Sequence, residues 1–130
     1  VLVVLDFDKF KRINDTHGHL YGDYVIKQVA DILQNSVRNN DVVARYGGEE
    51  YMIILVDTDQ TNSLAVTQRI VNNIEEFKFS RNGVDEKITI SAGMAEFPKD
   101  SDNIKILIEK ADKAMYRAKK LGGNKVEVYK

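Results

Sequence analysis

Two strand-like segments joined by a glycine-rich turn constrain the fold of this chain most strongly. Val42–Tyr46 and Tyr51–Val56 are rich in β-branched and aromatic residues, and Gly47-Gly48-Glu49-Glu50 lies between them. Two consecutive glycines permit the positive φ angles that tight hairpin turns need. The pattern predicts a β-hairpin that carries two adjacent carboxylates at its turn.

Hydrophobic periodicity predicts the remaining elements. Strands are predicted over Val1–Leu5, Lys87–Phe97 and Lys125–Lys130. Helices are predicted over Lys9–Asn14, over Tyr21–Arg38, over Thr61–Phe77, and from Ile104 to the Gly122-Gly123 pair. The stretch Ser80–Glu86 is polar and is expected to be a loop.

These elements follow the order βααββαβαβ, which contains the β-α-β-β-α-β unit of ferredoxin-like folds. We therefore predict an α+β fold of the ferredoxin-like, palm type, with an antiparallel-containing sheet and flanking helices. In that topology the first strand pairs antiparallel with the strand that follows the hairpin turn. Asp6 ends the first strand, so it should lie beside Glu49 and Glu50, and three carboxylates distant in sequence should meet at one sheet edge.

Composition excludes several classes of protein. The 130 residues carry 19 Lys and Arg against 20 Asp and Glu, so a nucleic-acid binder that works by overall positive charge is disfavoured. The absence of cysteine excludes a disulfide scaffold, a thiolate zinc site and a cysteine nucleophile, and it fits a reducing, cytoplasmic compartment. The apolar runs are too short to span a bilayer, so no membrane association is expected within this chain.

Three segments resemble the GGDEF family of diguanylate cyclases. The hairpin reads RYGGEEY from Arg45, the upstream stretch reads DFDKFKRINDTHGHLYGDYVI from Asp6, and the late stretch reads ADKAMYRAKKLGGN from Ala111. Their order and extent imply that residues 1–130 form a single GGDEF domain. The helix that precedes the first strand in that family is not in this sequence, so we expect a fragment of a longer multidomain protein.

The resemblance implies a diguanylate cyclase, which condenses two GTP molecules into cyclic di-GMP and two pyrophosphates. Each 3′-hydroxyl attacks the α-phosphate of the other nucleotide, so two domains must face each other as a homodimer. The implied cofactor is Mg²⁺ or Mn²⁺, because a divalent metal bridges phosphate oxygens and eases deprotonation of the hydroxyl. Cyclic di-GMP is expected both as product and as inhibitor.

By the same resemblance, the metal ligands are Asp6, the Phe7 carbonyl and Glu49. Glu50 would be a second-metal ligand or the base that acts on the 3′-hydroxyl. Taken singly, the acids have a simpler interpretation, in which Asp6 caps the next helix and Glu49-Glu50 is a solvated turn. Their convergence at one sheet edge favours metal binding.

A phosphate site is expected at the turn into the first helix. This turn predicts free backbone N–H groups at Asp8, Lys9 and Phe10, and a helix N-terminus suits the β- and γ-phosphates. Lys11 and Lys119 resemble the family's phosphate-binding lysines. Their alternative role is surface solubility.

Asn14 and Asp23 match the family's guanine contacts. An amide offers a donor and an acceptor to the base edge, and a carboxylate accepts from guanine N1–H and N2–H₂. Adenine lacks that pair of donors, so Asp23 would carry much of the specificity. The alternative is that Asn14 ends one helix and Asp23 caps the next.

Arg38-Asn39-Asn40-Asp41 resembles the family's RxxD inhibitory site, where product dimers bind. An Arg fork suits a phosphate or a guanine Hoogsteen edge, and Arg69 on the next helix is expected to add a contact. The rival interpretation is that Arg38 neutralises a helix C-terminus and pairs with Asp41 on the surface.

Tyr51 stands where Phe is usual in the family, and we expect little effect, because both rings can fill the same pocket. Gly123 stands where an Arg often contacts phosphate, and this departure, with the missing helix before the first strand, leaves another function open. The second candidate function is therefore a non-catalytic GTP-binding or cyclic di-GMP-binding regulatory domain. A third, a structural ferredoxin-like domain without nucleotide, leaves the convergence of carboxylates unexplained.

Overall fold

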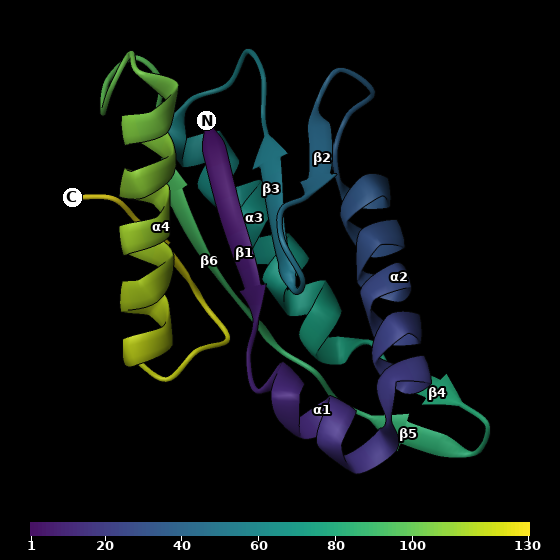
Figure 1. Cartoon of the computed structure of the whole chain (residues 1–130). Coiled ribbons are helices and arrows are strands. Elements are labelled where there is room, and N and C mark those ends of the chain that lie inside the picture. The colour runs from purple at the N-terminus through teal and green to yellow at the C-terminus, as the bar shows by residue number, and fades with distance from the viewer.

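The central feature of the protein is a five-stranded mixed sheet in the order β2-β3-β1-β6-β7 (Figure 1). The computed structural model describes residues 1–130. Its sheet strands are β1 (Leu2–Phe7), β2 (Val42–Arg45), β3 (Glu50–Ile54), β6 (Ile90–Ala95) and β7 (Val126–Val128). The central strand β1 runs antiparallel to both β3 and β6, whereas β7 pairs with β6 in parallel.

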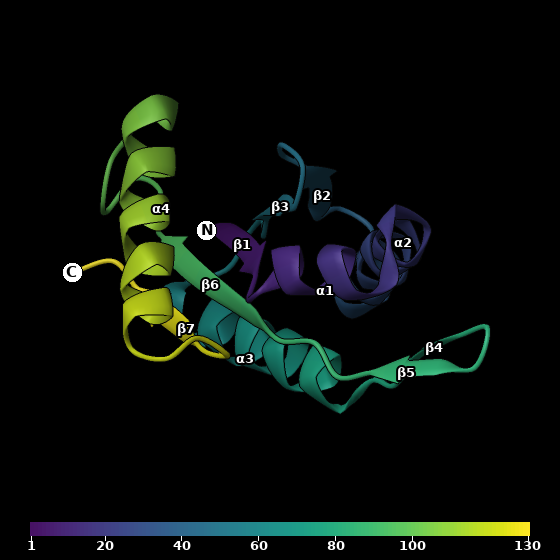
Figure 2. The same ribbon diagram turned by 60° about the horizontal axis from the view of Figure 1, so that its bottom comes forward.

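Four helices cover the two faces of this sheet, and the alternation of side chains along β1 explains the division. The helices are α1 (Phe10–His17), α2 (His19–Ser36), α3 (Gln60–Glu76) and α4 (Ile104–Lys120). Val3, Leu5 and Phe7 belong to the main core with α1, α2 and α3, while Leu2 and Val4 pack against α4. Figure 2 shows α3 and α4 on opposite sides of the sheet.

The contact between α4 and the sheet depends on one glycine in β6. A Cβ placed on Gly93 would overlap the Ala111 carbonyl and the Met115 backbone nitrogen. The helix therefore lies directly on the strand at this point. This close approach fixes the position of the last turn of α4, which carries Lys119, relative to the end of β1.

The predicted α+β class and the order of the long elements are confirmed, and most boundaries shift by less than one helical turn. The expectation of a loop over Ser80–Glu86 is wrong. Strands β4 (Phe79–Arg81) and β5 (Val84–Glu86) form a separate two-stranded hairpin. Asn82 and Gly83, at φ 50° and 80°, make its turn, because Asn and Gly tolerate the left-handed region that such hairpin turns require.

The β4–β5 hairpin is tied to the first two helices. Glu86 accepts hydrogen bonds from Arg12 at 3.2 Å and shares one with His17 at 2.7 Å, and the Tyr21 hydroxyl donates to the Phe79 carbonyl. These contacts hold α1 and the first turn of α2 against the β4–β5 hairpin. None of the four helices is long and apolar enough to cross a membrane.

Candidate functional site

The end of β1 lies beside the turn of the β2–β3 hairpin (Figure 1). In the antiparallel register Asp6 is directly opposite Glu50. Gly47 adopts φ 86° in the turn, and the Arg45 guanidinium closes it by donating to the Gly48 carbonyl at 2.6 Å and 3.2 Å. The sheet thus brings together the acidic groups that the sequence predicted at one edge.

Burial raises the pKa values of the three carboxylates at this edge, and the charge of Asp6 adds to the effect on Glu49 and Glu50. Burial raises the pKa of Asp6, and the nearby Lys119 ammonium opposes this effect. Burial followed by the charge of Asp6 raises the pKa of Glu49. The pKa of Glu50 is raised by burial and then by the charges of Asp6, Asp112 and Glu49. A crowded acidic cluster of this kind favours the binding of a cation.

The donor set fits a divalent metal that receives further ligands from a substrate. The Asp6 Oδ1 atom is buried and has no hydrogen-bond partner. No three acidic or histidine side chains are arranged to enclose a metal ion by themselves. Mg²⁺ commonly uses one or two carboxylates together with substrate phosphates and water, so a three-carboxylate enclosure is not needed.

The predicted role of the Asp8 N–H group is wrong. This N–H donates to the Thr89 carbonyl at 2.9 Å and is therefore not free for phosphate. The reason is that Phe7 pairs with Ile90 in the β1–β6 ladder, and the Asp8–Thr89 bond continues that ladder by one step beyond the strand. Sequence patterns do not reveal where a ladder stops.

The Asp8 side chain instead anchors the end of β1 to the rest of the fold. It accepts from the hydroxyls of Thr89 and Ser91 at 2.8 Å and 2.7 Å, from the Asn124 N–H at 2.9 Å and from Lys119 at 3.3 Å. Burial by itself would raise the pKa of Asp8, but these hydrogen bonds hold it below its ordinary value. The sequence analysis missed this role, because the partners lie more than 80 residues away.

The N-terminus of α1 begins after Lys9, which has a left-handed backbone at φ 57° and provides no side-chain cap. The first N–H groups of a helix have no acceptor within it. The backbone N–H groups at Lys9 and Phe10 thus remain candidates for an anion, and Lys11 is exposed on the same turn. Lys119 belongs to the last turn of α4, and its ammonium reaches the end of β1, where it lies 2.7 Å from the Phe7 carbonyl.

Asn14 lies where α1 and α2 pack together. Its Oδ1 atom is buried and has no partner, and a Cβ placed on Gly22 would overlap that oxygen. Asp23 follows Gly22 directly and is exposed, at the rim of a cavity of about 570 Å³ that Ile26 and Arg45 also line. The two predicted guanine contacts therefore lie in one region, and the space beside Gly22 that holds the Asn14 amide was not predicted from the sequence. The sequence does carry a signal for this close contact, because a glycine inside a helical pattern usually has a packing or functional reason.

Tyr51 uses its additional hydroxyl to join the hairpin to α2. The ring is buried, and the hydroxyl donates to the Ile26 carbonyl at 2.6 Å. Burial raises the pKa of Tyr51 to about 12. The substitution of Tyr for Phe therefore adds a contact between the hairpin that carries Glu50 and the helix that carries Asp23.

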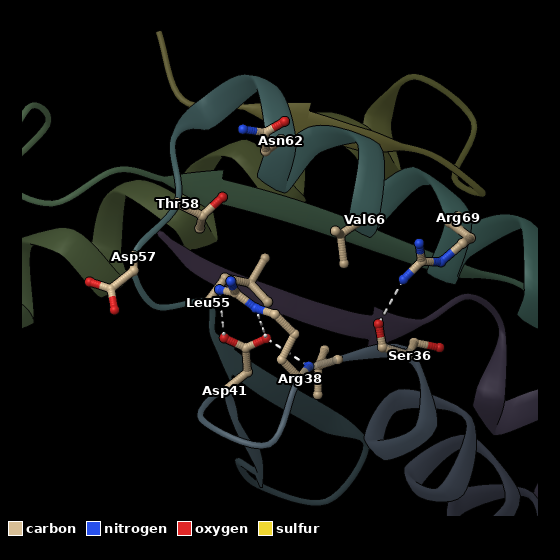
Figure 3. A pocket seen from close by; sticks show the side chains of 10 residues that line it. Ser36, Arg38, Asp41, Leu55, Asp57, Thr58, Asn62, Val66 and Arg69 are labelled. Atoms are coloured by element: carbon tan, nitrogen blue, oxygen red, sulfur yellow. Dashed lines mark hydrogen bonds and ion pairs between the residues drawn. The ribbon is translucent and has the colours of Figure 1, made fainter.

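Arg38, Asp41 and Arg69 line a second cavity, of about 360 Å³, away from the acidic turn (Figure 3). Arg69 of α3 donates to the Ser36 carbonyl at 2.8 Å. Asp41 is buried and accepts from the N–H groups of Arg38 at 2.9 Å and Val56 at 3.0 Å. The rival interpretation, a surface pair of Arg38 and Asp41, is right about the pairing, at 3.4 Å, but wrong about the location, because Asp41 is only 7% exposed.

The electrostatics of this cavity are set by the buried carboxylate. Burial by itself would raise the pKa of Asp41, but the backbone hydrogen bonds and the Arg38 guanidinium hold it below its ordinary value. Arg38 is 3.4 Å from Asp41 and also donates to the Val56 carbonyl. The guanidinium is therefore held in place beside the cavity, and the Arg38 side chain as a whole is 62% exposed.

Comparison with known proteins agrees with this arrangement. A family model described as diguanylate cyclase, GGDEF domain, matches residues 1–125. The chain is 40% identical over 129 residues to diguanylate cyclase A of Treponema denticola, a match that covers 99% of this chain and 35% of that protein. The chain thus spans about a third of the length of this curated relative.

Solved structures show the same fold. The GGDEF domain of DgcB from Caulobacter crescentus, in complex with c-di-GMP, has a TM-score of 0.90 at 33% identity over 98% of this chain and 76% of that one. The active GGEEF domain of a diguanylate cyclase from Vibrio cholerae has a TM-score of 0.87 at 30% identity, over 99% of this chain and 81% of that one. On its sequence, its fold and its acidic turn, the chain belongs to the GGDEF domain family of diguanylate cyclases.

Proposed function

We propose that this chain is the catalytic domain of a diguanylate cyclase that condenses two GTP molecules into cyclic di-GMP and two pyrophosphates. The pairing of Asp6 with Glu50 in the sheet, with Glu49 beside it, is the observation that carries the proposal. The Vibrio cholerae domain that is described as active is called a GGEEF domain, and Gly47-Gly48-Glu49-Glu50 supplies the same four residue types in this chain.

In this proposal Asp6, Glu49 and the Phe7 carbonyl hold Mg²⁺ or Mn²⁺. When bound, the metal supplies charge neutralisation at the phosphate oxygens and lowers the pKa of the attacking hydroxyl. Glu50 takes the proton from the 3′-hydroxyl or ligates a second metal.

Each half of the reaction forms one bond and breaks one bond. The 3′-oxygen of one GTP bonds to the α-phosphorus of the other, and the bond from that phosphorus to the pyrophosphate oxygen breaks. The N–H groups at Lys9 and Phe10, with Lys11, would bind the phosphates that leave. Asn14 and Asp23 would bind guanine and so orient the nucleotide.

The two nucleotides require two copies of the domain. A single site holds one GTP, whereas the product joins two, so two domains face each other, most simply with two-fold symmetry. Specific activity should therefore rise with protein concentration. A constant specific activity in a verified monomer contradicts this part of the proposal.

The cavity of Arg38, Asp41 and Arg69 is proposed as the inhibitory product site. The exposed Arg38 guanidinium and the nearby Arg69 provide two fixed cations for phosphates. Because this cavity and the acidic turn have no lining residue in common, binding there would act as allosteric coupling between separate sites.

One observation favours a second function. Gly123 lies beside Asp8 and stands where the family often has an Arg. The contact that such an Arg would make with phosphate is therefore lost. A regulatory domain that binds GTP or cyclic di-GMP without turnover is therefore the alternative.

Incubation with GTP and Mg²⁺, followed by measurement of cyclic di-GMP and pyrophosphate, tests both functions. Asp6→Asn serves as the inactive control. Turnover in the wild type alone supports the cyclase. Tight nucleotide binding without pyrophosphate release supports the regulatory domain and overturns the cyclase.

A further inference from the structure

Lys119 makes contacts that a phosphate-binding lysine does not require. Its ammonium lies 2.7 Å from the Phe7 carbonyl, 3.3 Å from Asp8 Oδ1 and 3.6 Å from Asp6 Oδ2. Two of these groups, the Phe7 carbonyl and the Asp6 carboxylate, are the oxygens proposed above to hold the metal. The lysine and the metal thus have overlapping sets of partners.

The charges around the site explain why an internal cation is favourable there. Lys119 opposes the raised pKa of Asp6, and its charge acts in the same direction on Glu49 and Glu50. The side chain is 28% exposed, which means that the ammonium is partly withdrawn from water. Without it, the Phe7 carbonyl would lose the hydrogen bond that Lys119 provides.

We propose that Lys119 is an internal counter-cation of the metal site, which holds the Phe7 carbonyl and the Asp6 carboxylate until a divalent cation displaces it from these oxygens. The inference rests on the proposed metal site. It adds that metal binding and the release of Lys119 are one exchange, in which the ammonium leaves the Phe7 carbonyl and becomes available to an incoming phosphate.

The adjacent lysine provides a matched control. Lys120 carries the same charge, one residue later in α4, but is exposed and places its ammonium 4.9 Å from the ring centre of Tyr116. Substitution of either lysine by Met changes the net charge by the same amount. Only Lys119→Met removes a partner from the acidic site.

The first experiment compares both variants with the wild type in thermal unfolding, in EDTA and in Mg²⁺, without nucleotide. In EDTA, Lys119→Met should lower the melting temperature by about 3 °C or more relative to Lys120→Met, because it leaves an acidic cluster without its cation. Mg²⁺ should remove most of that difference. Equal melting temperatures of the two variants in EDTA overturn the proposal.

The second experiment measures Mn²⁺ binding by electron paramagnetic resonance in the same proteins. Lys119→Met should bind Mn²⁺ about three- to tenfold more tightly than the wild type, since the competing cation is gone, and Lys120→Met should resemble the wild type. Unchanged or weaker binding in Lys119→Met overturns the proposal. Absence of binding in every variant also overturns it, whereas the cyclase proposal then still stands if the GTP assay succeeds.

A measurement on the wild type removes any dependence on the folding of variants. Amine acetylation followed by mass spectrometry reports how accessible each lysine is. Mg²⁺ should increase acetylation at Lys119 and leave Lys120 unchanged. If Mg²⁺ has no effect at Lys119, or protects it, no exchange takes place and the proposal fails.

Discussion

The Asn14 carboxamide occupies the space that a side chain on residue 22 would fill. A Cβ on Gly22 would overlap Asn14 Oδ1 and would lie 3.3 Å from the Phe10 ring. The absence of a side chain at Gly22 therefore determines where the amide of Asn14 can lie between α1 and α2. Asp23, the second predicted guanine contact, is the next residue in the chain.

Gly22→Ala should weaken GTP binding by about tenfold or more and reduce the preference for GTP over ATP, because the methyl group displaces the Asn14 amide. Calorimetric titration of both nucleotides measures the effect. Asn14→Ala should produce a similar loss, and the double variant should lose little more than either single variant. Additive losses would mean that Gly22 acts independently of Asn14.

Glu50→Gln should reduce turnover by about 10²- to 10⁴-fold while GTP affinity and the melting temperature stay close to wild type. Glu50 is only partly buried, at the start of β3, so its substitution should affect the rate and not folding. Product formation and a thermal melt are measured side by side. Turnover near the wild-type rate would remove Glu50 from the mechanism.

Arg38→Ala should relieve inhibition by cyclic di-GMP, because it removes an exposed guanidinium fork from the second cavity. Steady-state rates at several product concentrations, each divided by the variant's own uninhibited rate, measure the effect. Inhibition of the wild type should not compete with GTP. If inhibition is absent, or competitive and unchanged in Arg38→Ala, the cavity is not an inhibitory site.

Asp41→Asn should lower the free energy of unfolding by about 2 kcal/mol at pH 7, because the buried carboxylate accepts hydrogen bonds from two backbone N–H groups and a guanidinium. The folded-state pKa of Asp41 lies below its ordinary value of 3.8. Its contribution is therefore complete above pH 3.8 and is lost as the pH falls through the lowered value.

The difference in stability between wild type and Asp41→Asn should accordingly shrink as the pH is lowered below 3.8. Denaturant unfolding at a series of pH values measures it. Asp57→Asn is the matched control, because Asp57 lines the same cavity, is exposed and has φ 50°, a conformation that Asn adopts readily. A constant difference across this range would show that the Asp41 charge does not stabilise the fold.

Local patterns in the chain were sufficient to predict the class of fold and the grouping of the acids. Residues 2 positions apart in a strand lie on the same face, and helical spacing recurs every 3.6 residues, so local periodicity was enough to locate the long elements. The hairpin turn and the order of elements then predicted that Asp6 lies beside Glu49 and Glu50, and the observed register puts Asp6 opposite Glu50. The β4–β5 hairpin was not predicted, because strands of three residues are too short to show a clear periodicity.

Roles that depend on distant partners became visible in the folded chain alone. Thr89, Ser91 and Asn124 satisfy Asp8, and the ladder to β6 occupies its N–H group. Lys119 reaches the Phe7 carbonyl because Gly93 lets α4 lie directly on the sheet. Hydrogen bonds and ion pairs act over a few ångströms between groups more than 80 residues apart, and no local pattern in the sequence records which of these groups the fold brings into contact.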